Sequence, residues 1–144
     1  MIIRTAKPSD SLTLAHLACN MWSDDVSAHE QAFSELIRSP EAVCFLAFAD
    51  EDAIGFAQCQ LRHDYVEGCS TSPVGFLEGV WVDPAHRCTG VARSLVTACE
   101  DWARSKGCTE FASDCEIDNT DSLHFHLSIG FEEAGRTIWF GKKL

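Results

Sequence analysis

The amino-acid sequence predicts a mixed α/β fold in which one central sheet is flanked by helices. Short apolar runs typical of strands alternate with segments whose apolar residues recur at helical spacing. One helical segment, residues 90–105, lies between two such runs, and a helix in that position connects strands that run parallel. A chain of 144 residues is long enough to bury a proper core, so we expect a single domain spanning residues 1–144.

The first part of the chain predicts one strand and two helices. Residues 1–6 form the expected strand, and residues 9–22 place apolar side chains on one helical face. Residues 27–39 form the second helix. There Ser27 and Glu30 stand three residues apart in the capping-box pattern, which predicts a helix that begins after Ser27.

The rest of the chain predicts a hairpin followed by alternating strands and helices. Residues 42–61 contain two apolar runs around Asp50–Ala53, as in a hairpin. Gly107 and Gly130 mark the ends of two later helices. The elements expected after the hairpin are a strand at 74–82, a helix at 90–105, a strand at 108–113, a short helix within 119–131 and a last strand at 136–142.

The charge balance excludes one class of partner. The chain has 22 acidic and 11 basic residues, a formal net charge of −11, and Arg38 is the only Lys or Arg between Pro8 and Leu61, against nine acids. Phosphate contacts need Lys and Arg, so we expect no nucleic acid partner. A cationic ligand fits this balance, and so does the simpler interpretation that the charge serves solubility.

Eight cysteines are scattered without a C-x-x-C pair, and several lie inside apolar runs such as 43–49. We interpret them as core residues of a protein from a reducing compartment, the cytoplasm, and expect neither a metal site nor a disulfide framework. The N-terminus lacks the apolar region of a signal peptide, and the run 43–49 is too short to span a membrane, so we expect no membrane association.

Residues 82–95, VDPAHRCTGVARSL, predict a strand end, a turn at Pro84 and the start of a helix. A helix N-terminus carries unpaired N–H groups and partial positive charge, which suits phosphate. Gly90 and Ala92 would let a pyrophosphate approach the backbone, and Arg87 would add a charged contact. Neither a P-loop nor a G-x-G-x-x-G motif is present, and the pattern alone fits a tight strand–helix turn equally well.

The wider stretch VWVDPAHRCTGVARSL (80–95) resembles the acetyl-CoA signature of the GCN5-related N-acetyltransferases, V-x-P-x-x-R-x-x-G-x-A/G-x-x-L. The segment DNTDSLHFHLSIGF (118–131) resembles the second motif of that family, an Asn before a short helix that ends in G-F. The expected order of strands and helices also matches this fold over nearly the whole chain. Within the family, the segment TSPVGFLEG (71–79) resembles the corresponding segment of the aminoglycoside 6'-N-acetyltransferases, which are bacterial resistance enzymes.

The resemblance implies that acetyl-CoA is the co-substrate, without a metal. A strand segment would pair with the pantetheine arm, hold the thioester and polarise the acetyl carbonyl through an N–H group. The loop before the helix would bind the pyrophosphate. The matching positions are Val80, Trp81 and Val82 on the strand, Arg87, Cys88, Thr89, Gly90, Val91, Ala92 and Arg93 in the loop and first helical turn, and Asn119 beside the cofactor.

The resemblance also implies an aminoglycoside substrate, and the acidic residues fit its ammonium groups. The attacking amine must be neutral, although a free primary amine with a pKa of about 10.4 is almost fully protonated at neutral pH. We expect Asp114 or Glu78 to serve as the base. His126 matches the Tyr that protonates departing CoA, and His124 is a neighbouring candidate. The expected substrate-binding positions are Trp22, Tyr65, Glu78, Asp114 and Glu133.

Gly135 and Arg136 stand where related sequences tend to have a further acid, so Glu133 is the candidate to replace it. The resemblance implies a homodimer, supported by the apolar stretch TIWF (137–140).

Two other functions remain open from the sequence. One is an acetyltransferase of the same fold acting on a polyamine or a protein amine. The other is a non-catalytic module that binds acetyl-CoA or an aminoglycoside.

Overall fold

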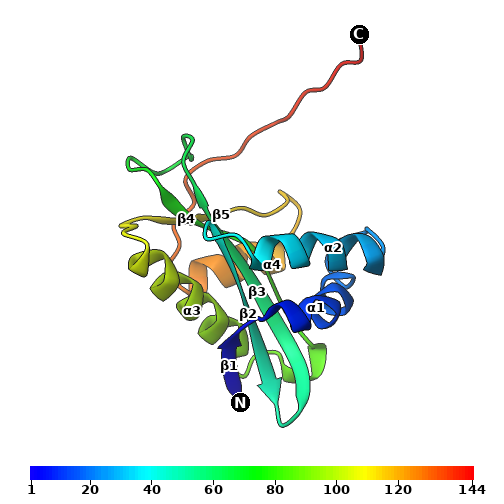
Figure 1. Cartoon of the computed structure of the whole chain (residues 1–144). Helices are drawn as coiled ribbons and strands as arrows, with labels where there is room; N and C mark the ends of the chain where they lie inside the picture. The colour runs from blue at the N-terminus through cyan, green and yellow to red at the C-terminus, as the bar shows by residue number, and fades with distance from the viewer.

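The computed structural model covers residues 1–144 and centres on one five-stranded sheet (Figure 1). The strands lie in the order β1-β2-β3-β4-β5, and every neighbouring pair is antiparallel except β4 and β5, which are parallel. This confirms the predicted mixed sheet. The strands are β1 (Ile2–Thr5), β2 (Ala42–Ala49), β3 (Asp52–Arg62), β4 (Val74–Val82) and β5 (Phe111–Ser113).

Helices cover both faces of the sheet, α1 and α2 on one side and α3 and α4 on the other (Figure 1). The predicted crossover is confirmed, since α3 connects the parallel strands β4 and β5. None of the helices is long and apolar enough to cross a membrane. The helical elements are η1 (Pro8–Asp10), α1 (Ser11–Ala18), α2 (Val26–Ile37), η2 (Pro84–His86), α3 (Val91–Ser105) and α4 (Thr120–Ser128).

The start of α2 differs from the predicted capping box. Asp25, rather than Ser27, is the N-cap, and its carboxylate accepts a hydrogen bond from the Ala28 N–H at 2.8 Å. Asp is as good a cap as Ser, and Asp25 adopts the extended backbone that the cap position requires. The helix therefore begins two residues earlier than predicted, and Ser27 lies within its first turn.

Two hydrophobic clusters fill the space between the sheet and its helices. Successive side chains of β3 point to opposite faces of the sheet and so contribute to both clusters. Phe56 packs toward α1 and α2, whereas Ala57 and Cys59 pack toward α3. Cys44, Cys59, Cys99 and Cys108 are buried and all eight cysteines are free, which confirms that several are core residues. Burial raises the pKa of the Cys44 thiol to about 12, so this thiol stays protonated and unreactive.

The strand β4 is irregular on both of its edges. It pairs with β5 over three residues only, and the pairing ends at Leu77 opposite Ser113. On its other edge the register with β3 shifts, because Gln58 faces Gly79 while Cys59 faces Leu77. Glu78 is therefore the extra residue of a β-bulge, a feature that re-aims a side chain and increases strand twist.

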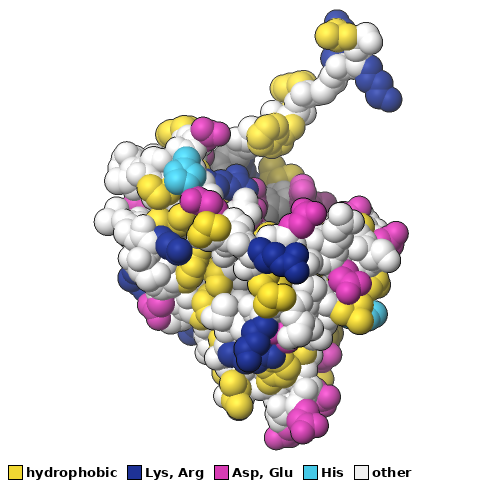
Figure 2. All heavy atoms as spheres, viewed as in Figure 1, with side chains coloured by type: hydrophobic (Ala, Val, Ile, Leu, Met, Phe, Trp, Pro, Cys, Tyr) yellow, Lys and Arg dark blue, Asp and Glu magenta, His cyan; other side chains and the backbone are white.

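The prediction of a last strand at 136–142 is wrong. Residues 131–144 contain no helix or strand, and Trp139 and Phe140 are 90% and 92% exposed. A strand needs N–H and C=O partners, and this segment leaves the body of the molecule without reaching any (Figures 1 and 2). Figure 2 shows its hydrophobic side chains standing clear of the rest of the surface.

Candidate functional site

The candidate site lies where β4 and β5 separate, at the carboxyl ends of these parallel strands. Glu78 occupies the bulge of β4, one residue after the last pair with β5. Asp114 follows the last residue of β5 and is exposed. Ligands of open α/β sheets collect at this edge. The structure thus brings together the two carboxylates that the sequence predicted as base and substrate ligands.

Arg62, the last residue of β3, holds the Glu78 carboxylate. Its Nε and one terminal nitrogen donate to Oε1 of Glu78 at 3.1 and 3.0 Å, and that terminal nitrogen also donates to Oε2 at 3.0 Å. The guanidinium carbon lies 3.5 Å from the centre of the Phe76 ring. Ion pair and ring together fix the orientation of a carboxylate that is only 17% exposed.

The charge of Glu78 reflects three opposing influences. Burial raises the pKa of Glu78 above the ordinary carboxyl value, the hydrogen bonds and charge of Arg62 lower it in part, and the nearby charge of Asp114 raises it again. A raised pKa favours the protonated form in the folded state. The stability this contributes is complete below the unfolded pKa and is lost as the pH rises through the folded pKa.

Trp22 reaches this part of the sheet from the end of α1. A Cβ placed on Gly79 would lie 2.6 Å from the Trp22 ring, so the absence of a side chain at Gly79 is what lets the indole approach β4 beside Glu78. The same ring packs edge-on against Phe56 at 6.0 Å. Trp22 is therefore both a neighbour of the site and part of the hydrophobic cluster beneath it.

Tyr65 and Glu133 lie in two segments that touch one another. Tyr65 is 78% exposed and donates from its hydroxyl to Glu67 at 3.2 Å. Glu133, beyond α4, is ion-paired with Arg136. A Cβ on Gly68 would lie 2.5 Å from the Ala134 methyl group, which places the loop of Tyr65 against the segment of Glu133. The pair with Arg136 competes for the charge that Glu133 would offer to a substrate.

The edge of β4 that faces β5 is open from Gly79 onward. Val80, Trp81 and Val82 pair with β3 on one side, while β5 ends before it reaches them. Alternate residues of an antiparallel strand direct their N–H and C=O groups to opposite edges. The predicted segment therefore presents backbone hydrogen-bonding groups to the gap between β4 and β5, as a bound extended arm would require.

The loop before α3 has the backbone geometry of an anion cradle. Cys88 and Gly90 adopt positive φ angles of 60° and 90°, and Gly90 is the N-cap of α3. No side chain caps the helix, and a Cβ on Gly90 would meet nothing within 4 Å. The N–H groups of the first turn, Val91 to Arg93, are thus left unpaired at an open surface, the arrangement that binds phosphate.

Several predicted cofactor residues have partners within the protein. Arg87 donates from Nε to the Val82 carbonyl at 2.9 Å, and Thr89 donates to the His86 carbonyl at 2.5 Å. Arg93 donates to the Ser128 carbonyl at 3.1 Å, which ties the start of α3 to the end of α4. Asn119 caps α4 by accepting from the Ser122 N–H at 3.1 Å. These side chains therefore have structural roles within the protein, and their contacts with a cofactor stay a prediction.

The structure separates the two histidines of α4. His124 is exposed, whereas His126 is half-buried and makes two close contacts. Its Nε2 lies 2.8 Å from the Ser113 hydroxyl and its Nδ1 lies 2.7 Å from the Ser122 carbonyl oxygen. His126 therefore stands at the end of β5, beside the gap, and is the better placed candidate for an acid.

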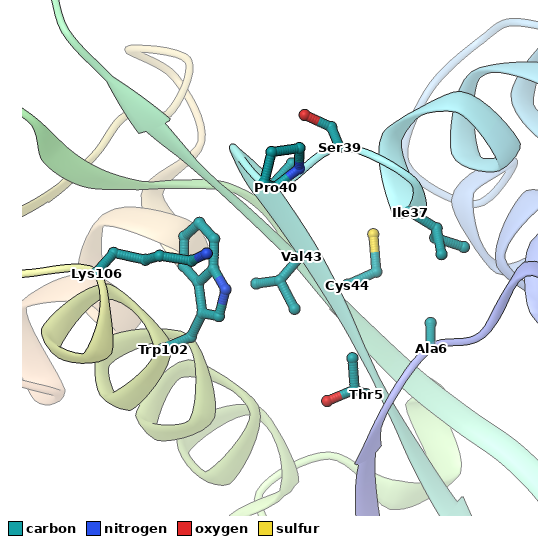
Figure 3. A pocket seen from close by; sticks show the side chains of 10 residues that line it. Thr5, Ala6, Ile37, Ser39, Pro40, Val43, Cys44, Trp102 and Lys106 are labelled. Carbon is teal, nitrogen blue, oxygen red and sulfur yellow. The ribbon is translucent and has the colours of Figure 1, made fainter.

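A separate groove of about 270 Å³ lies away from these residues, between the start of β2 and the end of α3 (Figure 3). Trp102 and Lys106 form one wall, with the ammonium 5.8 Å from the indole centre, and Val43 and Cys44 lie on β2 between the walls. None of its lining residues belongs to the predicted site.

Sequence reasoning missed Arg62 and Ser113, and also Glu110. The Glu110 carboxylate accepts from the N–H groups of Ser70 and Thr71 at 2.9 and 2.7 Å and so anchors the end of the Tyr65 loop to β5. Each of these contacts joins residues far apart in the sequence. No local pattern signals them, because they depend on strand register.

Comparisons with known proteins agree with this geometry. A model of the acetyltransferase (GNAT) family matches residues 10–131. The aminoglycoside N(6')-acetyltransferase type 1 of Acinetobacter haemolyticus is 41% identical over 144 residues, covering 100% of this chain and 99% of that protein.

Two solved structures are similar over almost the entire chain. The apo crystal structure of the aminoglycoside 6'-N-acetyltransferase AAC(6')-Ig from A. haemolyticus has a TM-score of 0.95 and covers 100% of this chain and 99% of that one, at 41% identity. AAC(6')-Iy in complex with the bisubstrate analogue CoA-S-monomethyl-acetylneamine has a TM-score of 0.94 at 40% identity, covering 99% of this chain and 98% of that one.

The ion pair at the bulge yields a testable expectation. Arg62→Gln removes the cation that partly offsets burial, so the pKa of Glu78 should rise further. Carbon-13 NMR titration of the Glu78 carboxyl measures this change. Arg104→Gln, which breaks an exposed pair with Asp101 on α3, should leave the titration of Glu78 unaltered. A Glu78 pKa that stays constant or falls in Arg62→Gln would contradict this account of the site.

Proposed function

Since the chain belongs to the acetyltransferase (GNAT) family, we propose that the gap between β4 and β5 is where it transfers the acetyl group of acetyl-CoA to the 6'-amine of an aminoglycoside. One observation carries the proposal: an uncapped helix N-terminus, an open strand edge and two carboxylates share the carboxyl ends of the two parallel strands. The alternatives, another amine substrate or a module without catalysis, gain no specific support from the geometry.

Acetyl-CoA would bind along β4. The unpaired N–H groups of Val91, Ala92 and Arg93, together with the positive-φ loop at Cys88 and Gly90, offer donors to the pyrophosphate. The open edge at 80–82 offers backbone partners to the pantetheine arm. Such an arm would occupy the place of a missing strand. An N–H of this edge would polarise the acetyl carbonyl as charge develops on its oxygen.

The aminoglycoside would bind where the carboxylates are concentrated. Glu78, held in place by Arg62, and exposed Asp114 would accept from its ammonium groups, with Trp22 beside them and Tyr65 and Glu133 along the rim. Asp114 is the better base, because it is not tied to a cation as Glu78 is. It would take the proton from the 6'-ammonium directly or through water.

The reaction would proceed by direct attack without a covalent enzyme intermediate. The neutral amine forms a C–N bond at the thioester carbonyl, the C–S bond breaks, and the electron pair passes to sulfur. His126 would supply the proton that the departing thiolate needs. No step of this sequence requires a metal ion or any of the eight cysteines.

The proposal also covers the oligomeric state and the cellular location of the enzyme. A homodimer fits the segment 132–144, whose exposed Ile138, Trp139 and Phe140 have no partner within this chain. A second copy is the partner we propose for them, since single chains rarely expose such a run.

A cytoplasmic location fits the eight free cysteines, because a reducing compartment keeps thiols unpaired.

The function is tested with a pair of aminoglycosides that differ at one group. The purified protein should release CoA from acetyl-CoA with a drug that carries a 6'-amine and show no release with a matched drug that carries a 6'-hydroxyl. Mass spectrometry of the product should place a single acetyl group at the 6' position. Release with polyamines but with neither drug would favour the other amine substrates, and no release at all would favour a binding module.

The base is tested by Asp114→Asn. This substitution keeps the shape of the side chain but removes the proton acceptor, so kcat should fall by about 10²- to 10⁴-fold. The Kd for acetyl-CoA, measured by calorimetry, should stay the same. Asp101→Asn, an exposed acid of α3, is the matched control and should retain full activity. Unchanged kcat in Asp114→Asn would show that Asp114 is not the base.

The homodimer is tested by changing the two most exposed aromatics of the tail. The intact chain should sediment at twice its mass of 15.9 kDa, and Trp139→Ser with Phe140→Ser should sediment as a monomer. The control is Ile2→Ser, an exposed apolar residue of β1 far from the tail (Figure 1). A monomeric intact chain at micromolar concentration would overturn the proposal.

A further inference from the structure

The ring of His126 is held on both sides by oxygen atoms. On one side Nδ1 faces the carbonyl oxygen of Ser122, one turn earlier in α4, at 2.7 Å. On the other side Nε2 faces the hydroxyl of Ser113, the last residue of β5, at 2.8 Å. The Ser113 hydroxyl also lies 3.1 Å from the carbonyl oxygen of Leu77 on β4. The hydroxyl therefore bridges both strands and the imidazole at the point where the strands separate.

Counting protons assigns the hydrogen bonds for each charge state of the ring. A carbonyl oxygen only accepts, so Nδ1 carries a proton in both states. When His126 is neutral, Nε2 accepts, and the single proton of Ser113 points to it. When His126 is protonated, Nε2 donates to the oxygen of Ser113, and the serine proton turns to the Leu77 carbonyl. No buried donor or acceptor of the ring loses its partner in either state.

We propose that Ser113 is a positioning residue for the acetyl-transfer reaction. The Ser113 hydroxyl rotates, so that the His126 ring keeps one orientation before and after the ring gives up its proton. This inference rests on the proposed role of His126 as the acid. A hydroxyl suits this task because it both donates and accepts. A methyl group would do neither, and a carboxylate could only accept.

Among the neighbours of the His126 ring, Ser113 is the one that can change its hydrogen bond when the ring changes charge. The centres of the Phe125 and Phe131 rings lie 5.9 and 5.2 Å from the centre of the His126 ring, and neither ring carries an oxygen or nitrogen that could bond the imidazole nitrogens. The Ser122 hydroxyl is a weaker contact of Nδ1, at 3.3 Å. Only the Nε2 side changes role when the ring changes charge, and Ser113 is the group on that side.

Ser113 keeps its own proton throughout the chemical step and changes only the direction of its hydroxyl. The C–S bond breaks with its electron pair on sulfur. The thiolate shares the Nε2 proton of His126 with the Ser113 oxygen as a second acceptor and then takes that proton, and the ring becomes neutral. As that proton leaves, the serine proton turns from the Leu77 carbonyl to Nε2. The proton released by the attacking amine goes to the base, and His126 regains its proton from water before the next turnover.

The first measurement is the single-turnover rate of acetyl transfer in Ser113→Ala. We expect this rate to fall by about tenfold, a part of the 10²- to 10⁴-fold that proton transfer contributes, while KM for acetyl-CoA stays unchanged. Ser113→Thr keeps the hydroxyl and should recover most of the rate. Ser128→Ala removes a hydroxyl of α4 that bonds only the Phe125 carbonyl and should match the intact enzyme.

The second measurement distinguishes positioning from a structural effect on the strands. In a His126→Phe background the ring nitrogens are gone, so adding Ser113→Ala should cause no further loss of rate. An equal loss in both backgrounds would overturn the proposal, because Ser113 would then act through β4 and β5. If His126→Phe alone keeps the full rate, the acid role of His126 is wrong. Absence of aminoglycoside turnover in the intact enzyme would instead refute the proposed function.

Discussion

The separation of β4 from β5 after only three paired residues is the constraint on which the rest of the site depends. Because β5 stops at Ser113, the far half of β4 keeps one edge free for an extended ligand. The bulge at Glu78 adds twist at the same place, and Arg62 of β3 holds its carboxylate there. The loop after β4 then delivers the open N-terminus of α3 to the end of this edge. Strand geometry would thus position the proposed acetyl-CoA and aminoglycoside subsites together.

The electrostatics of the site combine a strongly negative chain with one well-placed cation. The raised pKa of Glu78 reflects its own burial and the repulsion from the nearby, exposed Asp114. Arg62 reduces this penalty while it leaves Asp114 free. One acid is thus oriented by a cation, and the other is the exposed acid that we propose as the base. A polycationic substrate would complete the neutralisation that Arg62 begins.

The sequence was informative where structure depends on neighbours in the chain. Periodicity and glycines predicted α3, the hairpin and the short helix before Gly130, and the sequence around Gly90 predicted a turn followed by the start of a helix. Contacts set by register were not predictable. Arg62 and Glu78 lie 16 residues apart, and Ser113 and His126 lie 13 apart. The tail failed as a strand for a related reason, since apolar β-prone residues form one only where a partner edge is available.

The close approach of Trp22 to Gly79 carries a consequence for the history of this enzyme. The indole fills the space that any side chain at position 79 would need, and it also belongs to the cluster beneath α1 and α2. Position 79 is therefore not free to take a side chain while the indole of Trp22 stays in place. A larger residue at position 79 would therefore need a smaller ring at position 22. Such paired replacements would appear as covariation between positions 22 and 79 in related sequences.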